Sequence, residues 1–165
     1  MSGKDWFVVN ARDVPWRGRE GLGRICDLEG DGEFEELGFI VSVLDPGVPH
    51  CMYHGESGQE DFLVVAGECV LVIEGEERQL KAWDFVHCPP MTEHVFVGAG
   101  SGPCVIVMVG ARKPEGDEGI IYPVNEVAAK RGASVLEETP DPAEAYARFT
   151  RREPSPYREG DLPEL

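Results

Sequence analysis

Basic residues are scarce in this chain of 165 residues. Fifteen lysines and arginines stand against 31 aspartates and glutamates, which gives a formal net charge of -16. A charge of this sign repels the phosphate backbone of nucleic acids and the surface of anionic membranes. The sequence therefore predicts that neither nucleic acid nor a membrane is a partner, and it favours solubility as the role of the acidic surface.

Long hydrophobic runs are also missing. The longest fully apolar run near the C-terminal end, 105–109, is far too short to cross a bilayer. The first residues, MSGKDWFVVNARD, contain acidic side chains and lack the apolar segment of a signal peptide. The five cysteines are scattered without a CxxC pair, which is typical of buried thiols in a reducing compartment. We therefore expect a cytoplasmic protein.

Short apolar segments are what the chain does contain, between about residues 39 and 111. They are FIVSVL, EDFLVVAG, CVLVIEG, WDFVHCP, EHVFVG and CVIVMVG. Each has the length of a strand, is rich in β-branched and aromatic residues, and is bounded by Gly, Pro or Asp. No helical crossover fits between them, so the sequence predicts an antiparallel, all-β sandwich or barrel.

Two of these segments, FLVV and VIVMV, are apolar on both alternating faces. A strand with one wet face should alternate between apolar and polar residues, so both faces of these strands are expected to be covered. The cover is either the other sheet together with the N-terminal strands, or a second subunit. Both explanations fit the pattern, and we predict a homodimer.

The chain divides into a barrel core and three flanking parts. Asn125 and Gly132 are expected to begin and end one short helix, and an Asp-Pro pair at 141–142 begins a second helix that reaches about residue 149. The last residues hold three prolines, many charges and no apolar periodicity. The predicted parts are N-terminal strands and loops (1–38), the core (39–111), a charged loop with two helices (112–150) and a flexible tail (151–165).

All four histidines, His50, His54, His87 and His94, lie inside the strand-rich region. Alternate residues of a strand share a face, so His54 and Glu56 can point together. Glu60 opens the next strand after a Ser-Gly turn, and His94 begins a later one. Imidazole nitrogens and carboxylate oxygens are ligands that suit zinc, iron, manganese or nickel. Glu60 directly precedes an apolar strand, where a charge is costly without a partner. The alternative is that Glu60 pairs with an arginine such as Arg78 or lies at an exposed strand end.

These residues resemble the two motifs of the cupin superfamily, G(X)5HXH(X)3-4E(X)6G and G(X)5PXG(X)2H(X)3N. The first is matched by His54, Glu56, Glu60 and Gly67, and the second by Trp83, Pro89, Met91, His94 and Gly98. The fifteen residues between them, 68–82, match the short linker of many microbial cupins. The resemblance covers about residues 40–111. It implies a double-stranded β-helix (jelly-roll) barrel that holds one divalent metal ion, with short C-terminal helices following it in this chain.

The chain departs from the motifs at informative positions. Glu56 stands where the family usually has its second histidine, Trp83 and Met91 replace two motif glycines, and Gly98 replaces the asparagine. If Glu56 binds, two carboxylates neutralise a divalent ion and the site leans away from copper. If Glu56 turns away, the other three ligands resemble the two-His, one-carboxylate set of non-haem iron oxygenases. We favour the predicted ligand set His54, Glu56, Glu60 and His94.

The remaining candidates carry weaker signals. His50 shares a predicted strand face with His54 and is the candidate acid or base, with an ordinary hydrogen-bonded histidine as the alternative. His87 is expected to be structural, whereas Cys51 and Tyr53 should face away from the predicted ligands. An apolar pocket lining is expected from Phe62, Val64, Phe96 and Met108. The resemblance implies either a metal-dependent enzyme, such as a dioxygenase, isomerase or decarboxylase, acting on a small organic molecule, or a non-catalytic ligand-binding or sensor protein.

Overall fold

The computed structural model describes residues 6–29, 34–112 and 119–164. The strands are β1 (Trp16–Arg19), β2 (Leu22–Asp27), β3 (Leu37–Leu44), β4 (Gly55–Glu56), β5 (Glu60–Ala66), β6 (Glu68–Ile73), β7 (Glu76–Lys81), β8 (Phe85–Cys88), β9 (His94–Ala99), β10 (Cys104–Ala111), β11 (Ile120–Ile121) and β12 (Glu153–Ser155). The helices are α1 (Glu126–Lys130) and α2 (Pro142–Ala145). The expected charged loop after Arg112 lies almost wholly outside the described residues.

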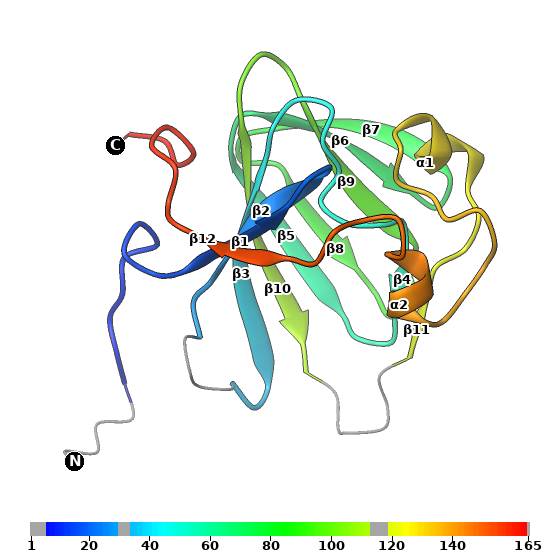
Figure 1. Ribbon diagram of the computed structural model, residues 1–165, viewed down its shortest axis with the longest axis horizontal. Helices are drawn as coiled ribbons and strands as arrows, with labels where there is room; N and C mark the ends of the chain where they lie inside the picture. Colours follow the sequence, from blue (N-terminus) through cyan, green and yellow to red (C-terminus); the bar gives the residue numbers. More distant parts are fainter. Residues whose placement is uncertain (1–5, 30–33, 113–118, 165) are drawn as a thin grey trace.

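Two antiparallel sheets form the body of the fold (Figure 1). The larger sheet has the strand order β12-β1-β2-β3-β10-β5-β8, the smaller has the order β7-β6-β9, and β11 pairs with β4. Each of the six apolar segments contributes a strand, and the register of β10 against β3 and β5 is antiparallel. The predicted all-β jelly-roll fold is therefore confirmed.

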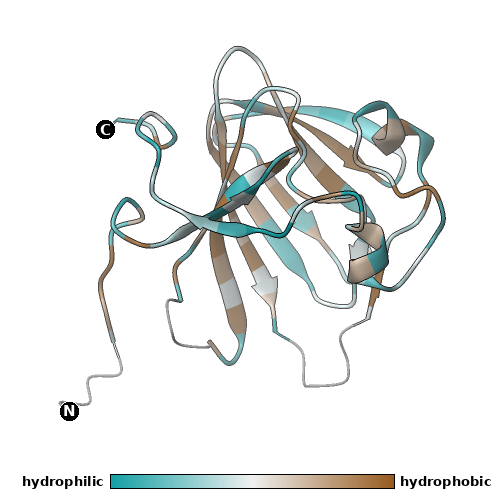
Figure 2. Cartoon of the chain, viewed as in Figure 1, coloured by the Kyte–Doolittle hydropathy of each residue, from teal (hydrophilic) through white to brown (hydrophobic). Residues whose placement is uncertain are grey.

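The main core lies between the two sheets. Side chains of β5 and β10, among them Val64 and Ile106, pack against Leu71 of β6 and Phe96 of β9. The strands that carry these residues are predominantly apolar along their length (Figure 2). Burial of such side chains contributes roughly 1.5 to 3 kcal/mol each, so this interface is the principal stabilising element.

A second apolar cluster covers the outer face of the larger sheet. Trp16 and Cys26, from β1 and β2, pack with Val41 and Val105, and Tyr157 of the C-terminal segment adds to the same cluster. The N-terminal strands therefore cover part of the second apolar face of β10. This packing supports the internal explanation for the two-faced strands, and no second subunit is needed to account for it.

The C-terminal segment is more ordered than the expectation of a loosely attached tail. β12 pairs with β1, with Gly18 opposite Glu153, and the buried side chain of Asp161 forms ion pairs with Arg24 and Arg158. Proline is tolerated on β12 because this strand lies at the edge of the sheet. Ion pairs and one edge ladder hold the segment in place, so it does not need an apolar periodicity.

Both helices begin at the predicted caps. The side chain of Asn125 accepts hydrogen bonds from the N–H groups of Val127 and Ala128 at 3.0 and 2.9 Å. The side chain of Asp141 accepts one from Ala143 N–H at 2.8 Å, but α2 ends at Ala145 rather than near residue 149. Neither helix, nor any other in the described ranges, combines the length and apolar character that a membrane crossing requires.

Two substituted motif glycines keep the backbone conformation of glycine. Trp83 has a φ of 75° and Met91 a φ of 67°, both in the left-handed region that side chains disfavour. Trp83 is also 77% exposed, so its indole gains little from burial. The backbone geometry of the second motif is thus retained although its glycines are not.

We predict that Trp83→Gly raises the free energy of unfolding by about 1 kcal/mol, because glycine adopts this φ without strain. The control is Phe85→Gly on β8, which also removes an exposed aromatic side chain but at a strand position. This control should lower stability by about 1 kcal/mol. Denaturant unfolding measures both, and an equal loss in the two variants would contradict the prediction.

Candidate metal centre

His54 and His94 face each other across a backbone bridge. The N–H of His94 donates to the carbonyl of His54 at 2.8 Å, the reverse bond measures 3.2 Å, and the ring centroids are 5.1 Å apart. The first motif and the second motif are therefore joined at these two residues. Both side chains are buried.

One ring nitrogen of each histidine is held by a carbonyl oxygen two residues earlier. His54 Nδ1 lies 2.8 Å from Met52 O, and His94 Nδ1 lies 2.9 Å from Thr92 O. His54 Nε2 also donates a hydrogen bond to Glu56 Oε1, so without an ion this ring carries a second proton, which an ion would displace. A carbonyl oxygen only accepts, so each Nδ1 carries a proton and each Nε2 is the atom available to an ion. This orientation is the one that metal-ligating histidines adopt.

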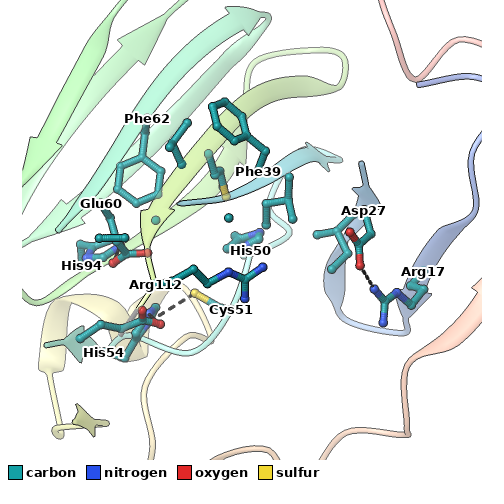
Figure 3. Close-up of a pocket in the computed structure, with 18 of the residues that line it drawn as sticks. Arg17, Asp27, Phe39, His50, Cys51, His54, Glu60, Phe62, His94 and Arg112 are labelled. Atoms are coloured by element: carbon teal, nitrogen blue, oxygen red, sulfur yellow. Dashed lines mark hydrogen bonds and ion pairs between the residues drawn. The ribbon is translucent and has the colours of Figure 1, made fainter. Parts of the chain in front are cut away.

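Glu60, the first residue of β5, supplies a carboxylate to the same point. Its Oε2 lies 3.5 Å from His94 Nε2, and donor atoms of His54, Glu60 and His94 all lie within 4.8 Å of one another (Figure 3). Bonds of about 2.0 to 2.2 Å to one ion place neighbouring ligand atoms about 3.0 to 3.5 Å apart. The three residues present therefore fit a single divalent ion.

Glu60 has no cationic side chain as its partner in the described part of the protein. The alternative pairing with Arg78 is wrong, because Arg78 pairs with Glu76 at 2.5 Å. Burial, followed by the charge of Glu56, raises the pKa of Glu60 to about 7. Burial, followed by the charge of His54, lowers the pKa of His94 to about 4. Burial therefore disfavours the charged forms of both Glu60 and His94, whereas the contacts with Cys51 and Glu56 raise the pKa of His54 despite its burial.

Glu56 lies beside His54 and outside the trio. Its Oε1 is 3.2 Å from His54 Nε2, and its side chain is 41% exposed. The hydrogen bond to His54 lowers the pKa of Glu56. As expected, the two side chains point together, but Glu56 is not among the described residues whose donor atoms lie within 4.8 Å of one another. Its role as a fourth ligand stays a prediction.

A cavity of about 550 Å³ adjoins the trio. Phe62 and Met108 line it as expected, whereas Val64 and Phe96 belong to the core between the sheets. Figure 3 shows Phe62, His50 and the ligand residues around the same space. The cavity is large enough for a small organic molecule.

His50 lines the cavity and is also held by hydrogen bonds, while its role as an acid or base stays a prediction. Its Nδ1 lies 2.8 Å from Ser42 Oγ, and its own N–H donates to Phe96 O at 2.8 Å. Burial, followed by the charge of Arg152, lowers the pKa of His50 to about 3. His50 is therefore neutral near pH 7.

The predictions for three other residues near the site have different outcomes. His87 is exposed and pairs with Asp61 at 2.7 Å, outside the cavity. Tyr53 faces away, and its hydroxyl accepts a hydrogen bond from Gly75 N–H at 3.2 Å. The placement of Cys51 was wrong: it lines the cavity, with Sγ 3.5 Å from His54 Nδ1. Residues 50–53 form bends rather than a strand, so the alternation of faces does not hold there.

Several cavity residues come from outside the motifs and were missed. Arg17 and Arg19 belong to β1, Arg152 precedes β12, and Tyr122 and Tyr146 lie in the C-terminal region. Nothing local in the sequence marks them: the pairing of β1 with β12 positions the three arginines, and Tyr122 is positioned by a bridge to Thr139.

The family model described as the cupin domain matches residues 40–110. Residues 40–110 form a cupin domain. A comparison with curated proteins finds no match. Among solved structures, the polyketide cyclase RemF from Streptomyces resistomycificus is 16% identical, with 66% of this chain and 80% of that chain covered and a TM-score of 0.58.

A second solved structure with this fold is an RmlC-like cupin from Shewanella frigidimarina. It is 20% identical, covers 65% of this chain and 91% of that chain, and has a TM-score of 0.55. The match spans about half of the DMSP lyase DddQ from Ruegeria pomeroyi, with 49% of that chain and 57% of this one, 21% identity and a TM-score of 0.49. At these identities the likeness shows the fold alone.

The lowered pKa of His50 predicts an acid-sensitive cupin domain. The unfolded chain binds a proton at this histidine below its ordinary pKa of 6.5, whereas the folded protein does so only near 3. The contribution of His50 to stability is therefore full above pH 6.5 and falls by about 1.4 kcal/mol per pH unit between these values. His50→Gln should remove this part of the slope in denaturant unfolding at a series of pH values. An unchanged slope would contradict the burial of a neutral His50.

Proposed function

We propose that this cupin binds one divalent metal ion through His54, Glu60 and His94 and binds a small organic molecule in the adjoining cavity, on which it acts. The observation that carries the proposal is the convergence of the Nε2 atoms of two histidines and one largely buried carboxylate beside a cavity of about 550 Å³. The donor set suits zinc, iron, manganese or nickel.

The residues around the cavity would orient the bound molecule. An ion held by His54, Glu60 and His94 would have fewer protein ligands than its full coordination number, so a bound molecule or water would complete it. Phe62 and Met108 exclude water from one wall, and Tyr122 and His50 offer polar atoms at others. When bound, a divalent ion supplies Lewis-acid polarisation of an oxygen atom or a site for O2.

His50 also supports the alternative, a cupin that binds its ligand without turnover. A histidine with a pKa of about 3 is a weak base, and it is the candidate acid or base that the sequence offered. In a binding protein, the neutral ring would serve as a hydrogen-bonding group that fixes the ligand. Turnover of a bound ligand by the metal-loaded protein separates the two functions.

The homodimer and the cytoplasmic location stay predictions. β8 lies at one end of the larger sheet, and its residue Phe85 is 62% exposed close to the exposed Trp83. Exposed aromatic side chains beside a free strand edge support an interface with a second copy.

His54→Ala and His94→Ala should each abolish stoichiometric metal binding, because each removes one of three ligands. Elemental analysis of the purified protein measures the metal content. His87→Ala is the matched control, since it removes an exposed histidine outside the cavity, and it should retain the wild-type content. Wild-type metal content in both ligand variants would contradict the site.

Glu56→Gln tests the fourth ligand separately. If Glu56 ligates the ion, the variant should bind metal at least about tenfold more weakly in a competition titration, because it loses a charged ligand. Unchanged affinity would show that Glu56 only orients His54 and that the trio is the complete protein ligand set.

A further inference from the structure

Two arginines from opposite ends of the chain meet at the wall of the cavity. Arg19 is the last residue of β1, and Arg152 immediately precedes β12. The ladder between these strands places Gly18 opposite Glu153, so the next step brings Arg19 and Arg152 alongside each other. Both side chains line the cavity that contains the metal ligands.

Neither guanidinium has an acidic partner among the described residues. The other two arginines of the cavity are paired: Arg17 with Asp27 (Figure 3), and Arg112 with Glu29. In contrast, the buried Nε atoms of Arg19 and Arg152 lack any hydrogen-bond partner in the described structure. A buried donor left unsatisfied destabilises the fold, and a ligand that supplies the acceptor would remove this cost.

The two like charges are held together rather than separated. The guanidinium of Arg19 lies 5.0 Å from the centre of the Tyr146 ring, and the Tyr146 hydroxyl accepts a hydrogen bond from Met52 N–H at 3.2 Å. Burial, followed by the charge of Arg19, lowers the pKa of Arg152. Like charges at facing positions of a ladder are destabilising, so this pair is a cost to the fold alone.

The count of charged groups around the cavity also gives an excess of positive charge once a divalent ion is included. Four arginines and four acidic residues of the described chain line it. A divalent ion at the trio would leave two positive charges uncompensated inside a protein whose formal net charge is -16. A neutral or cationic ligand would not relieve this excess, whereas an anionic one would.

We propose that Arg19 and Arg152 bind an oxyanion group, a carboxylate or a phosphate, of the small molecule held in this cavity. The planar guanidinium groups match both oxyanions through paired hydrogen bonds. The inference rests on the proposed function for the second contact of that molecule, at the metal. It assigns the substrate or ligand to the class of small organic anions.

Calorimetric titration of the metal-loaded full chain tests this assignment with three probes: succinate, glycerol 3-phosphate and the neutral succinamide. At least one of the two anions should bind, and the tighter one identifies the oxyanion. Arg19→Gln and Arg152→Gln should each weaken that binding by about tenfold or more. Arg78→Gln removes an arginine away from the cavity and should bind as the wild type does.

Two further measurements separate this proposal from the metal site. Metal content should stay at the wild-type level in both cavity variants. Without an anion, Arg152→Gln should have a higher melting temperature than the wild type, because one of two like charges is gone. Failure of both anions to bind the wild type, or equal binding by the variants, would overturn the proposal. If the wild-type protein takes up no metal but still binds an anion through these arginines, the anion site is supported and the proposed function is contradicted.

Discussion

The reciprocal backbone bridge between His54 and His94 is the constraint on which the site depends. It joins the segment before β4 to the start of β9, and it brings two imidazole rings within 5.1 Å. The carbonyls of Met52 and Thr92 then fix the protonated ring nitrogen. Local backbone geometry thus directs two Nε2 atoms to one point before any ion binds, which lowers the cost of organising the ligands.

The flanks complete what the cupin core begins. The core provides the ligand trio and the apolar wall, while β1 and the segment before β12 provide Arg19 and Arg152. The described acidic residues are mostly on the outer surface. The cavity, in contrast, has a net positive charge once a divalent ion is counted. A net charge of -16 is therefore compatible with the proposed anion-binding cavity.

The sequence predicted the elements whose signals are local. Strand-length apolar segments, the caps Asn125 and Asp141, and the motif spacing were sufficient for the fold and for bringing His54, Glu60 and His94 together. The second motif keeps its backbone geometry even at Trp83 and Met91, because these residues adopt the backbone conformation of the glycines they replace.

Features that depend on distant contacts were not predictable in this way. β12 has no apolar pattern, because an edge ladder and ion pairs hold it, and Arg152 reaches the cavity only through that ladder. Cys51 was misplaced because residues 50–53 bend instead of continuing a strand. The position of Glu56 depends on a side-chain rotamer beside His54, which spacing does not determine.

X-ray absorption spectroscopy at the edge of the bound metal tests the central claim most directly. The account predicts a first shell of two imidazole nitrogens and carboxylate or water oxygens at about 2.0 to 2.2 Å, without sulfur. A sulfur ligand at about 2.3 Å would show that Cys51 displaces a member of the trio. A first coordination shell without two imidazole nitrogens would contradict the binding of one ion by both His54 and His94.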